Sequence, residues 1–136
     1  MKKHIMPLVV ILLFGCSKDQ ITVNKLDGSW DMKSLTINGS PYQVVSGGWK
    51  FEKCKQSKGD CEGSYNVTFM ANGYPVTSAA TFEYEVKDKG TEMELLLYFA
   101  TYTDNTEADI DLDKDDLEIE YTEFDGTRVS MELERD

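Results

Sequence analysis

Basic residues, histidine, cysteine and proline are all scarce in this 136-residue chain. Its 14 lysines and arginines are outnumbered by 25 acidic residues, which gives a net charge of −11 at pH 7. Such a surface repels phosphate backbones and anionic headgroups, so we expect no nucleic-acid binding and no membrane attachment through a basic patch. The long apolar run at residues 5–14 is too short to cross a bilayer.

The N-terminus is typical of a secretory signal, because two lysines precede the apolar run. The run ends in Leu13-Phe14-Gly15-Cys16. This tetrapeptide resembles a bacterial lipobox, in which a small residue precedes a cysteine that is acylated and becomes the new N-terminus. The resemblance implies a signal peptide over residues 1–15 and a lipid anchor on Cys16. It also implies a place in the cell envelope, expected to be the outer membrane, facing the periplasm or the cell surface. An ordinary secretory signal cleaved near Gly15 is the alternative.

Loss of the signal would also remove the single histidine, His4. A mature chain without imidazole excludes serine–histidine and cysteine–histidine catalysis and histidine-ligated metals. The acidic residues occupy outward or turn positions, and no pair of them stands out as a catalytic acid and base. We therefore expect no enzymatic activity, no cofactor and no metal site.

Two cysteines, Cys54 and Cys61, remain once Cys16 is assigned to the lipid. They flank the polar turn Lys-Gln-Ser-Lys-Gly-Asp. Strands on either side of this turn would place them opposite each other, within reach of a disulfide, in a compartment that is oxidising. A redox pair or half of a metal site is the alternative, although C-x-x-C spacing and a nearby histidine are both missing.

The mature chain divides into a polar tether that includes the acylated cysteine, residues 16–25, and a single domain over residues 26–136. Alternating apolar and polar residues predict eight strands in this domain. Within the expected strand at residues 28–37, the apolar positions change from one face to the other. This change predicts a β-bulge near Lys33-Ser34. The expected strands are residues 28–37, 49–54, 64–70, 76–87, 93–99, 108–112, 117–121 and 129–133.

Each expected strand has one apolar face, and no helical period covers those faces. Such a sheet must fold onto itself as a barrel or a two-sheet sandwich. Short turns between successive strands favour an all-β, eight-stranded antiparallel up-and-down barrel. A β-sandwich is the alternative, but its crossovers would demand longer loops.

Gly28-Ser29-Trp30, at the start of the first expected strand, resembles the G-x-W signature of lipocalins. The resemblance implies a lipocalin-like barrel of the kind found in small envelope lipoproteins of bacteria. In lipocalins a basic residue near the end of the last strand often packs over this tryptophan. In an eight-strand meander the last strand ends beside the start of the first, so Arg135 is expected to cover Trp30 and plug one barrel end.

Two functions follow, and the sequence leaves both open. In the first, implied mostly by the resemblance, the barrel binds a small apolar or amphipathic ligand among its inward side chains. The expected lining residues are Met32, Tyr65, Val67, Phe69, Ser78, Ala80, Phe82, Tyr84, Leu95, Leu97, Ile119, Tyr121 and Met131. In the second, the barrel is fully packed and binds an envelope protein through loops at residues 41–48 and 98–106. Strand number does not decide between them, because an eight-stranded interior is either filled or just able to hold one small molecule.

The acidic segment between Asp109 and Glu120 has carboxylates at alternate positions, a spacing similar to that of an EF-hand calcium loop. Lys114 occupies the position where such a loop needs glycine. Two strands joined at Lys114-Asp115, with acids on the exposed face, explain the pattern more simply, so we expect no calcium site here.

Overall fold

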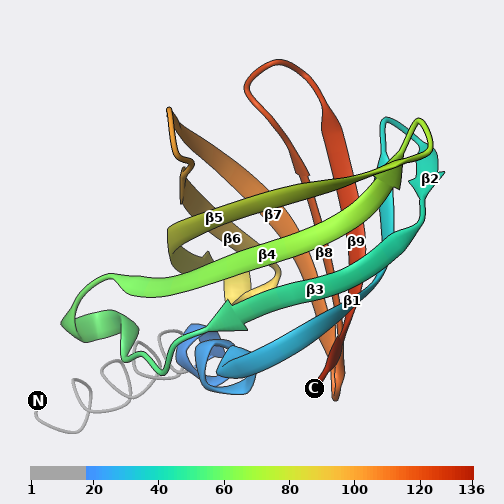
Figure 1. The fold of residues 1–136 in the computed structure, drawn as a ribbon. Helices are drawn as coiled ribbons and strands as arrows, with labels where there is room; N and C mark the ends of the chain where they lie inside the picture. The colour runs from blue at the N-terminus through green and yellow to red at the C-terminus, as the bar shows by residue number, and fades with distance from the viewer. Residues whose placement is uncertain (1–17) are drawn as a thin grey trace, which may run out of the picture.

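The computed structural model describes residues 18–136, so the predicted signal peptide and the predicted acylation at Cys16 lie outside the described residues. The described chain is built mainly of antiparallel strands (Figure 1). They are β1 (Gly28–Ile37), β2 (Ser40–Tyr42), β3 (Val44–Phe51), β4 (Cys61–Ala71), β5 (Tyr74–Lys87), β6 (Glu92–Tyr98), β7 (Thr103–Asp113), β8 (Asp116–Thr122) and β9 (Arg128–Arg135). Two short 3₁₀ turns, η1 (Gln56–Lys58) and η2 (Asp88–Gly90), lie between strands.

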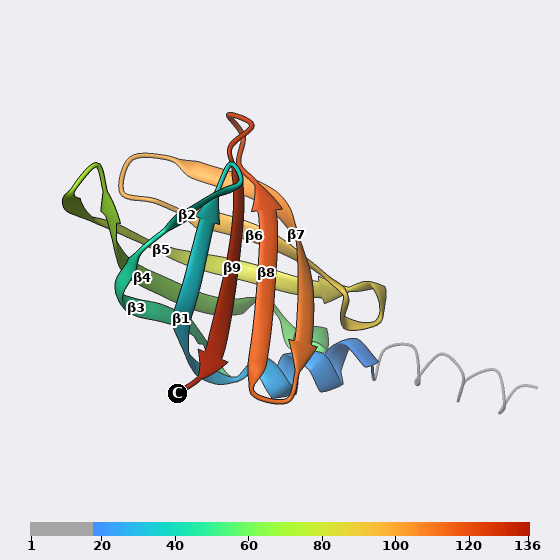
Figure 2. The same cartoon turned by 90° about the vertical axis from the view of Figure 1, so that its right-hand side faces the viewer.

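The sheet closes on itself because β1 pairs with both β3 and β9. β2 and β3 act as one strand interrupted at Gln43, since both pair with β1. The result is a closed eight-stranded antiparallel up-and-down barrel, which Figure 2 shows from the side. The predicted barrel is therefore confirmed, and the alternative β-sandwich does not form.

The alternation of side chains explains why the strands bury one face only. In β8, Leu117, Ile119 and Tyr121 are buried while Glu118 and Glu120 are exposed. The buried side chains of all the strands join in one hydrophobic cluster inside the barrel. The predicted bulge is also confirmed, because the β1–β9 register shifts between Met32 and Ser34.

The strand predicted at residues 49–54 was placed wrongly at both ends. β3 begins at Val44 and ends at Phe51, so most of the expected loop at residues 41–48 is strand. Gly47 and Gly48 interrupt the alternation because backbones of neighbouring strands pass very close to them. A Cβ on Gly48 would lie 1.8 Å from the Trp30 carbonyl oxygen, and one on Gly47 would lie 2.0 Å from that of Asn66. Glycine at such corners lets a strand bend into a barrel.

The prediction of a polar tether at residues 16–25 is wrong for residues 18–25, because residues 18–26 form a helix. This helix crosses one end of the barrel (Figures 1 and 2). Val23 and Leu26 on its inner side are fully buried, so the domain includes residues 18–26. In the described part of the chain, no helix has both the length and the apolar character needed to cross a membrane.

Candidate functional site

The two ends of the barrel differ, and the helical end is closed. Trp30 is buried there, and its indole Nε1 donates a hydrogen bond to the carbonyl oxygen of Leu26 at 2.8 Å. The Arg135 guanidinium lies 4.3 Å from the centroid of the Trp30 ring, which is the position that the sequence resemblance implies. Arg135 also donates hydrogen bonds to the carbonyl oxygens of Asp27, at 3.0 Å, and Lys25. The last strand thus holds the segment between helix and barrel.

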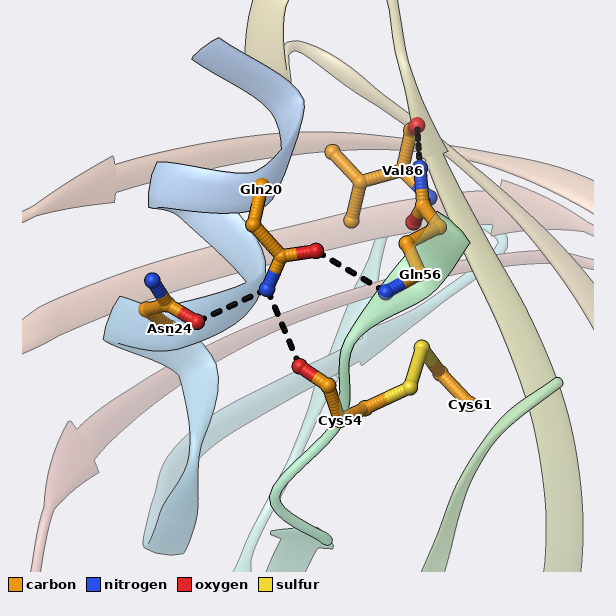
Figure 3. The surroundings of a disulfide bond; sticks show 6 residues. All are labelled: Gln20, Asn24, Cys54, Gln56, Cys61 and Val86. Atoms are coloured by element: carbon orange, nitrogen blue, oxygen red, sulfur yellow. Dashed lines mark hydrogen bonds between the residues drawn. A yellow bond between two sulfur atoms is a disulfide. The ribbon is translucent and has the colours of Figure 1, made fainter. Parts of the chain in front are cut away.

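A disulfide joins Cys54 and Cys61 at this closed end, with a Cα–Cα distance of 5.4 Å, so that prediction is confirmed. Figure 3 shows how the helix is attached to the same loop. The side chain of Gln20 accepts a hydrogen bond from the backbone N–H of Gln56 and donates one to the carbonyl oxygen of Cys54. The Gln56 side chain in turn pairs with both backbone groups of Val86. The helix, the disulfide loop and β5 are therefore linked.

The opposite end of the barrel, where the β4–β5, β6–β7 and β8–β9 connections lie (Figures 1 and 2), contains a cavity of about 140 Å³. Its walls come from β1, β3, β4, β5, β8 and β9 and are mostly apolar or aromatic. The lining residues are Met32, Leu35, Ile37, Trp49, Tyr65, Val67, Phe69, Ser78, Tyr121, Glu123, Val129 and Met131. We call this space the mouth cavity.

Only part of the expected lining set faces the mouth cavity: Met32, Tyr65, Val67, Phe69, Ser78, Tyr121 and Met131. The other expected residues do not line it, because they pack in the buried core that fills the rest of the barrel. They are Ala80, Phe82, Tyr84, Leu95, Leu97 and Ile119. Sequence reasoning missed five lining residues: Leu35, Ile37, Trp49, Glu123 and Val129. Continuing the alternation of β8 by one step from Tyr121 would have identified Glu123.

A line of aromatic rings connects the mouth cavity to the rim of the barrel. Trp49 stacks on Tyr65 with ring centroids 5.0 Å apart. The rings of Tyr65 and Phe99 form a T-shaped contact with centroids 6.4 Å apart. In the β6–β7 loop, Phe99 stacks on Tyr102 at 4.7 Å, and Tyr102 contacts Phe124 of the β8–β9 loop at 5.8 Å. The Phe124 side chain is 75% exposed. A ring-shaped molecule entering the barrel would meet aromatic surface along this path.

The polar groups of the mouth are phenols, a hydroxyl and carboxylates. The hydroxyls of Tyr65 and Ser78 lie 3.4 Å apart, and burial raises the pKa of Tyr65 to about 12. Burial also raises the pKa of Tyr121 well above its usual value. The pKa of the Glu123 carboxyl is raised by burial and, to a smaller extent, by the negative charges of Asp125 and Asp104. The mouth therefore disfavours further negative charge.

The acidic segment from Asp109 to Glu120 forms the β7–β8 hairpin, with Asp113 paired to Asp116 across a turn at Lys114-Asp115. Its carboxylates alternate with buried side chains and lie on the outer face. Within residues 18–136, no group of three or more histidine, cysteine or acidic side chains is arranged to hold a metal ion.

No protein-family model matches the chain, and no curated protein matches it. Two redesigned β-barrels are similar in structure. The barrel b11L5F_LGL superposes with a TM-score of 0.61 at 15% identity, covering 85% of this chain and 95% of that one. The barrel mFAP1, solved with DFHBI bound, gives a TM-score of 0.61 at 17% identity, covering 84% and 98%. At these identities the likeness shows the fold alone.

Proposed function

We propose that this protein binds a small apolar or amphipathic ligand in the mouth cavity. The observation that carries the proposal is the cavity itself: about 140 Å³ of space with mostly apolar and aromatic walls and a few polar groups. Apolar cavities of roughly 150 Å³ hold a molecule the size of benzene, whereas drug-sized ligands need roughly 300 Å³ or more. The ligand is therefore a single-ring molecule, or a longer one of which a single ring enters the barrel.

The similarity to mFAP1 supports this proposal at the level of architecture. That redesigned barrel has the same fold and was solved with the small molecule DFHBI bound. Eight-stranded barrels have an interior just wide enough for side chains or for one small ligand. In this chain the core fills the closed end, and the mouth cavity leaves the space for a ligand.

We further propose that the protein is a lipocalin-like envelope lipoprotein with a binding role and no catalytic one. The lipobox-like sequence that ends at Cys16 supports the anchor. The described chain begins at Lys18 in the helix that covers the closed end, and Asp19 accepts a hydrogen bond from the backbone N–H of Gly90 in η2. An anchor two residues before this helix would hold the closed end toward the membrane and leave the mouth facing away from it.

A second candidate function is protein binding at the rim. Tyr74, on the β4–β5 hairpin, is 73% exposed, and Phe124 is similarly exposed on the β8–β9 loop at the same end. Exposed aromatic side chains of this kind are enriched where proteins bind one another. This function would depend on Tyr74 and Phe124 and would not require the mouth cavity to stay open.

A substitution that fills the mouth cavity distinguishes ligand binding in the cavity from protein binding at the rim. Ser78 lines the cavity, whereas its neighbour Ala79 is exposed on the outer face of β5. Ser78→Phe is expected to abolish binding of neutral single-ring compounds such as benzyl alcohol, measured by ligand-observed NMR. The matched control Ala79→Phe adds the same ring outside the barrel and is expected to bind like the wild type. Equal binding by both variants, or no binding by the wild type, would contradict ligand binding in the cavity.

A further inference from the structure

Asp104 is a buried carboxylate near the mouth cavity, although it does not line it, and no cationic side chain among residues 18–136 pairs with it. Asp104 is on the inward-facing side of β7 and is only 4% exposed. Its Oδ2 atom is buried without a hydrogen-bond partner among the described residues. None of the ion pairs formed within residues 18–136 includes Asp104. Burying a carboxylate is costly unless a cation or hydrogen bonds compensate its charge.

A second carboxylate belongs to the cavity wall itself. Glu123 lines the mouth cavity, and Asp104 lies near enough to raise its pKa through charge repulsion. Asp104 has the same effect on Tyr65 and Tyr121, two further lining residues. In the described part of the chain, no lysine, arginine or histidine lines this cavity. The cavity therefore has one carboxylate on its wall and a second one close to its lining residues, and no positive side chain of the described residues lines it.

The remaining walls suit a positive charge as well. Trp49 and Tyr65 line the cavity with aromatic rings. Burial raises the pKa of Tyr102, and the negative charges of Glu123 and Asp104 raise it further, so this ring lies near both carboxylates. The faces of such rings attract ammonium groups within about 6 Å of the ring centroid. Carboxylates and aromatic rings together are the groups that recognise an organic cation.

We propose that the ligand of the mouth cavity is a small organic cation, with an ammonium group on a single-ring apolar body. Its ammonium group pairs with Glu123 on the cavity wall and is attracted by the nearby charge of Asp104, and its ring packs among Trp49, Tyr65 and the aliphatic walls. This assignment rests on the proposed function and adds the chemical class of the ligand.

Three probes of similar shape and different charge test the assignment: benzylamine, which is cationic at neutral pH, neutral benzyl alcohol, and anionic benzoate. Each probe is titrated into the full chain, and NMR measures its binding. We expect benzylamine to bind at least tenfold more tightly than benzyl alcohol, and benzoate to bind most weakly. Asp104→Asn and Glu123→Gln are each expected to weaken benzylamine binding at least threefold more than they weaken benzyl alcohol binding. Asp111→Asn is the matched control, because Asp111 is exposed on the outer face of β7.

The outcomes separate this inference from the proposed function. Benzyl alcohol binding as tightly as benzylamine would overturn the cation assignment and leave ligand binding in place. A benzylamine preference that Asp111→Asn reduces as much as Asp104→Asn would also overturn it, because the preference would then come from overall charge. Binding of none of the three probes would contradict both proposals. Circular dichroism checks the fold of each variant, and Glu123→Gln provides the test if Asp104→Asn does not fold.

Discussion

The two tryptophans are register partners on β1 and β3 and differ in whether their indole N–H groups are paired. The indole N–H of Trp30 donates to Leu26, and its ring lies under Arg135. The indole Nε1 of Trp49 is buried without a hydrogen-bond partner among the described residues, although its ring lines the mouth cavity. A buried, unpaired donor reduces stability, so the hydrogen bond of Trp30 stabilises the fold while the unpaired N–H of Trp49 does not.

Replacement of Arg135 by methionine tests the closed end. The substitution removes the cation–π contact with Trp30 and the hydrogen bonds to Asp27 and Lys25 while keeping a long apolar side chain. We expect Arg135→Met to lower the free energy of unfolding by about 2 kcal/mol. Arg128→Met, at the exposed start of β9, is the control and should change it by less than about 0.5 kcal/mol. Equal losses in urea denaturation would refute a specific role for Arg135.

The buried tyrosines predict alkaline unfolding. Burial raises the pKa of both Tyr65 and Tyr84 to about 12, against 10 in an unfolded chain. Between these pH values the folded state holds more protons than the unfolded state, so the free energy of unfolding falls as pH rises. Stability is thus fully retained below pH 10 and lost toward pH 12. Circular dichroism should show this loss, and Tyr84→Phe should shift it to higher pH. An intact fold in which all seven tyrosines ionise near pH 10 would contradict the prediction.

At the scale of elements, strands with strict alternation were predictable and elements stabilised by tertiary contacts were not. β5 and β8 alternate clearly, and their predicted ranges agree with the structure. The start of β3 was missed because its glycines are required by close backbone contacts rather than by a side-chain pattern. The helix at residues 18–26 was missed because its few apolar side chains form no sustained period, and its stability comes from packing on the barrel.

The helix should therefore behave as part of the core. Leu26 is fully buried, whereas Ile21 on the same helix is 49% exposed. Leu26→Ala is expected to lower the free energy of unfolding by about 3 kcal/mol, because it opens a cavity under the helix. Ile21→Ala, measured in the same denaturation series, should cost less than about 1 kcal/mol. If residues 18–26 were only a tether, neither substitution would change stability.

The disulfide loop makes a separate contribution. The bridge between Cys54 and Cys61 closes a short loop with a sequence separation of 7. Loop-closure entropy predicts that the double variant Cys54→Ser/Cys61→Ser loses about 2–3 kcal/mol of unfolding free energy. Thermal melting of the oxidised wild type, the reduced wild type and the double variant measures this loss. The last two should agree, and a reduced wild type as stable as the oxidised form would contradict the estimate.

For the whole molecule, the sequence predicted the barrel and its interior face but not where the interior is hollow. Alternation places a residue such as Leu97 or Tyr65 on the inward face, but it does not reveal which of them is packed by neighbours from other strands. That outcome depends on how side chains from all the strands fill the space. The core is complete at the helical end, and the mouth cavity remains at the other, lined by Ser78 and Glu123 among larger side chains.

The most direct test of ligand binding in the mouth cavity uses the two indole N–H signals of the protein in a nitrogen–proton NMR spectrum. Trp49 lines the cavity, whereas Trp30, its register partner on β1, does not line it and donates its indole N–H to the carbonyl oxygen of Leu26. The Trp49 signal is therefore expected to respond more strongly than the Trp30 signal. Trp30→Phe assigns them by removing one signal. On titration with benzyl alcohol, we expect the Trp49 signal to shift in a saturable way and clearly further than the Trp30 signal. A Trp49 signal that does not move, or equal movement of both signals, would contradict ligand binding at the open end of the barrel.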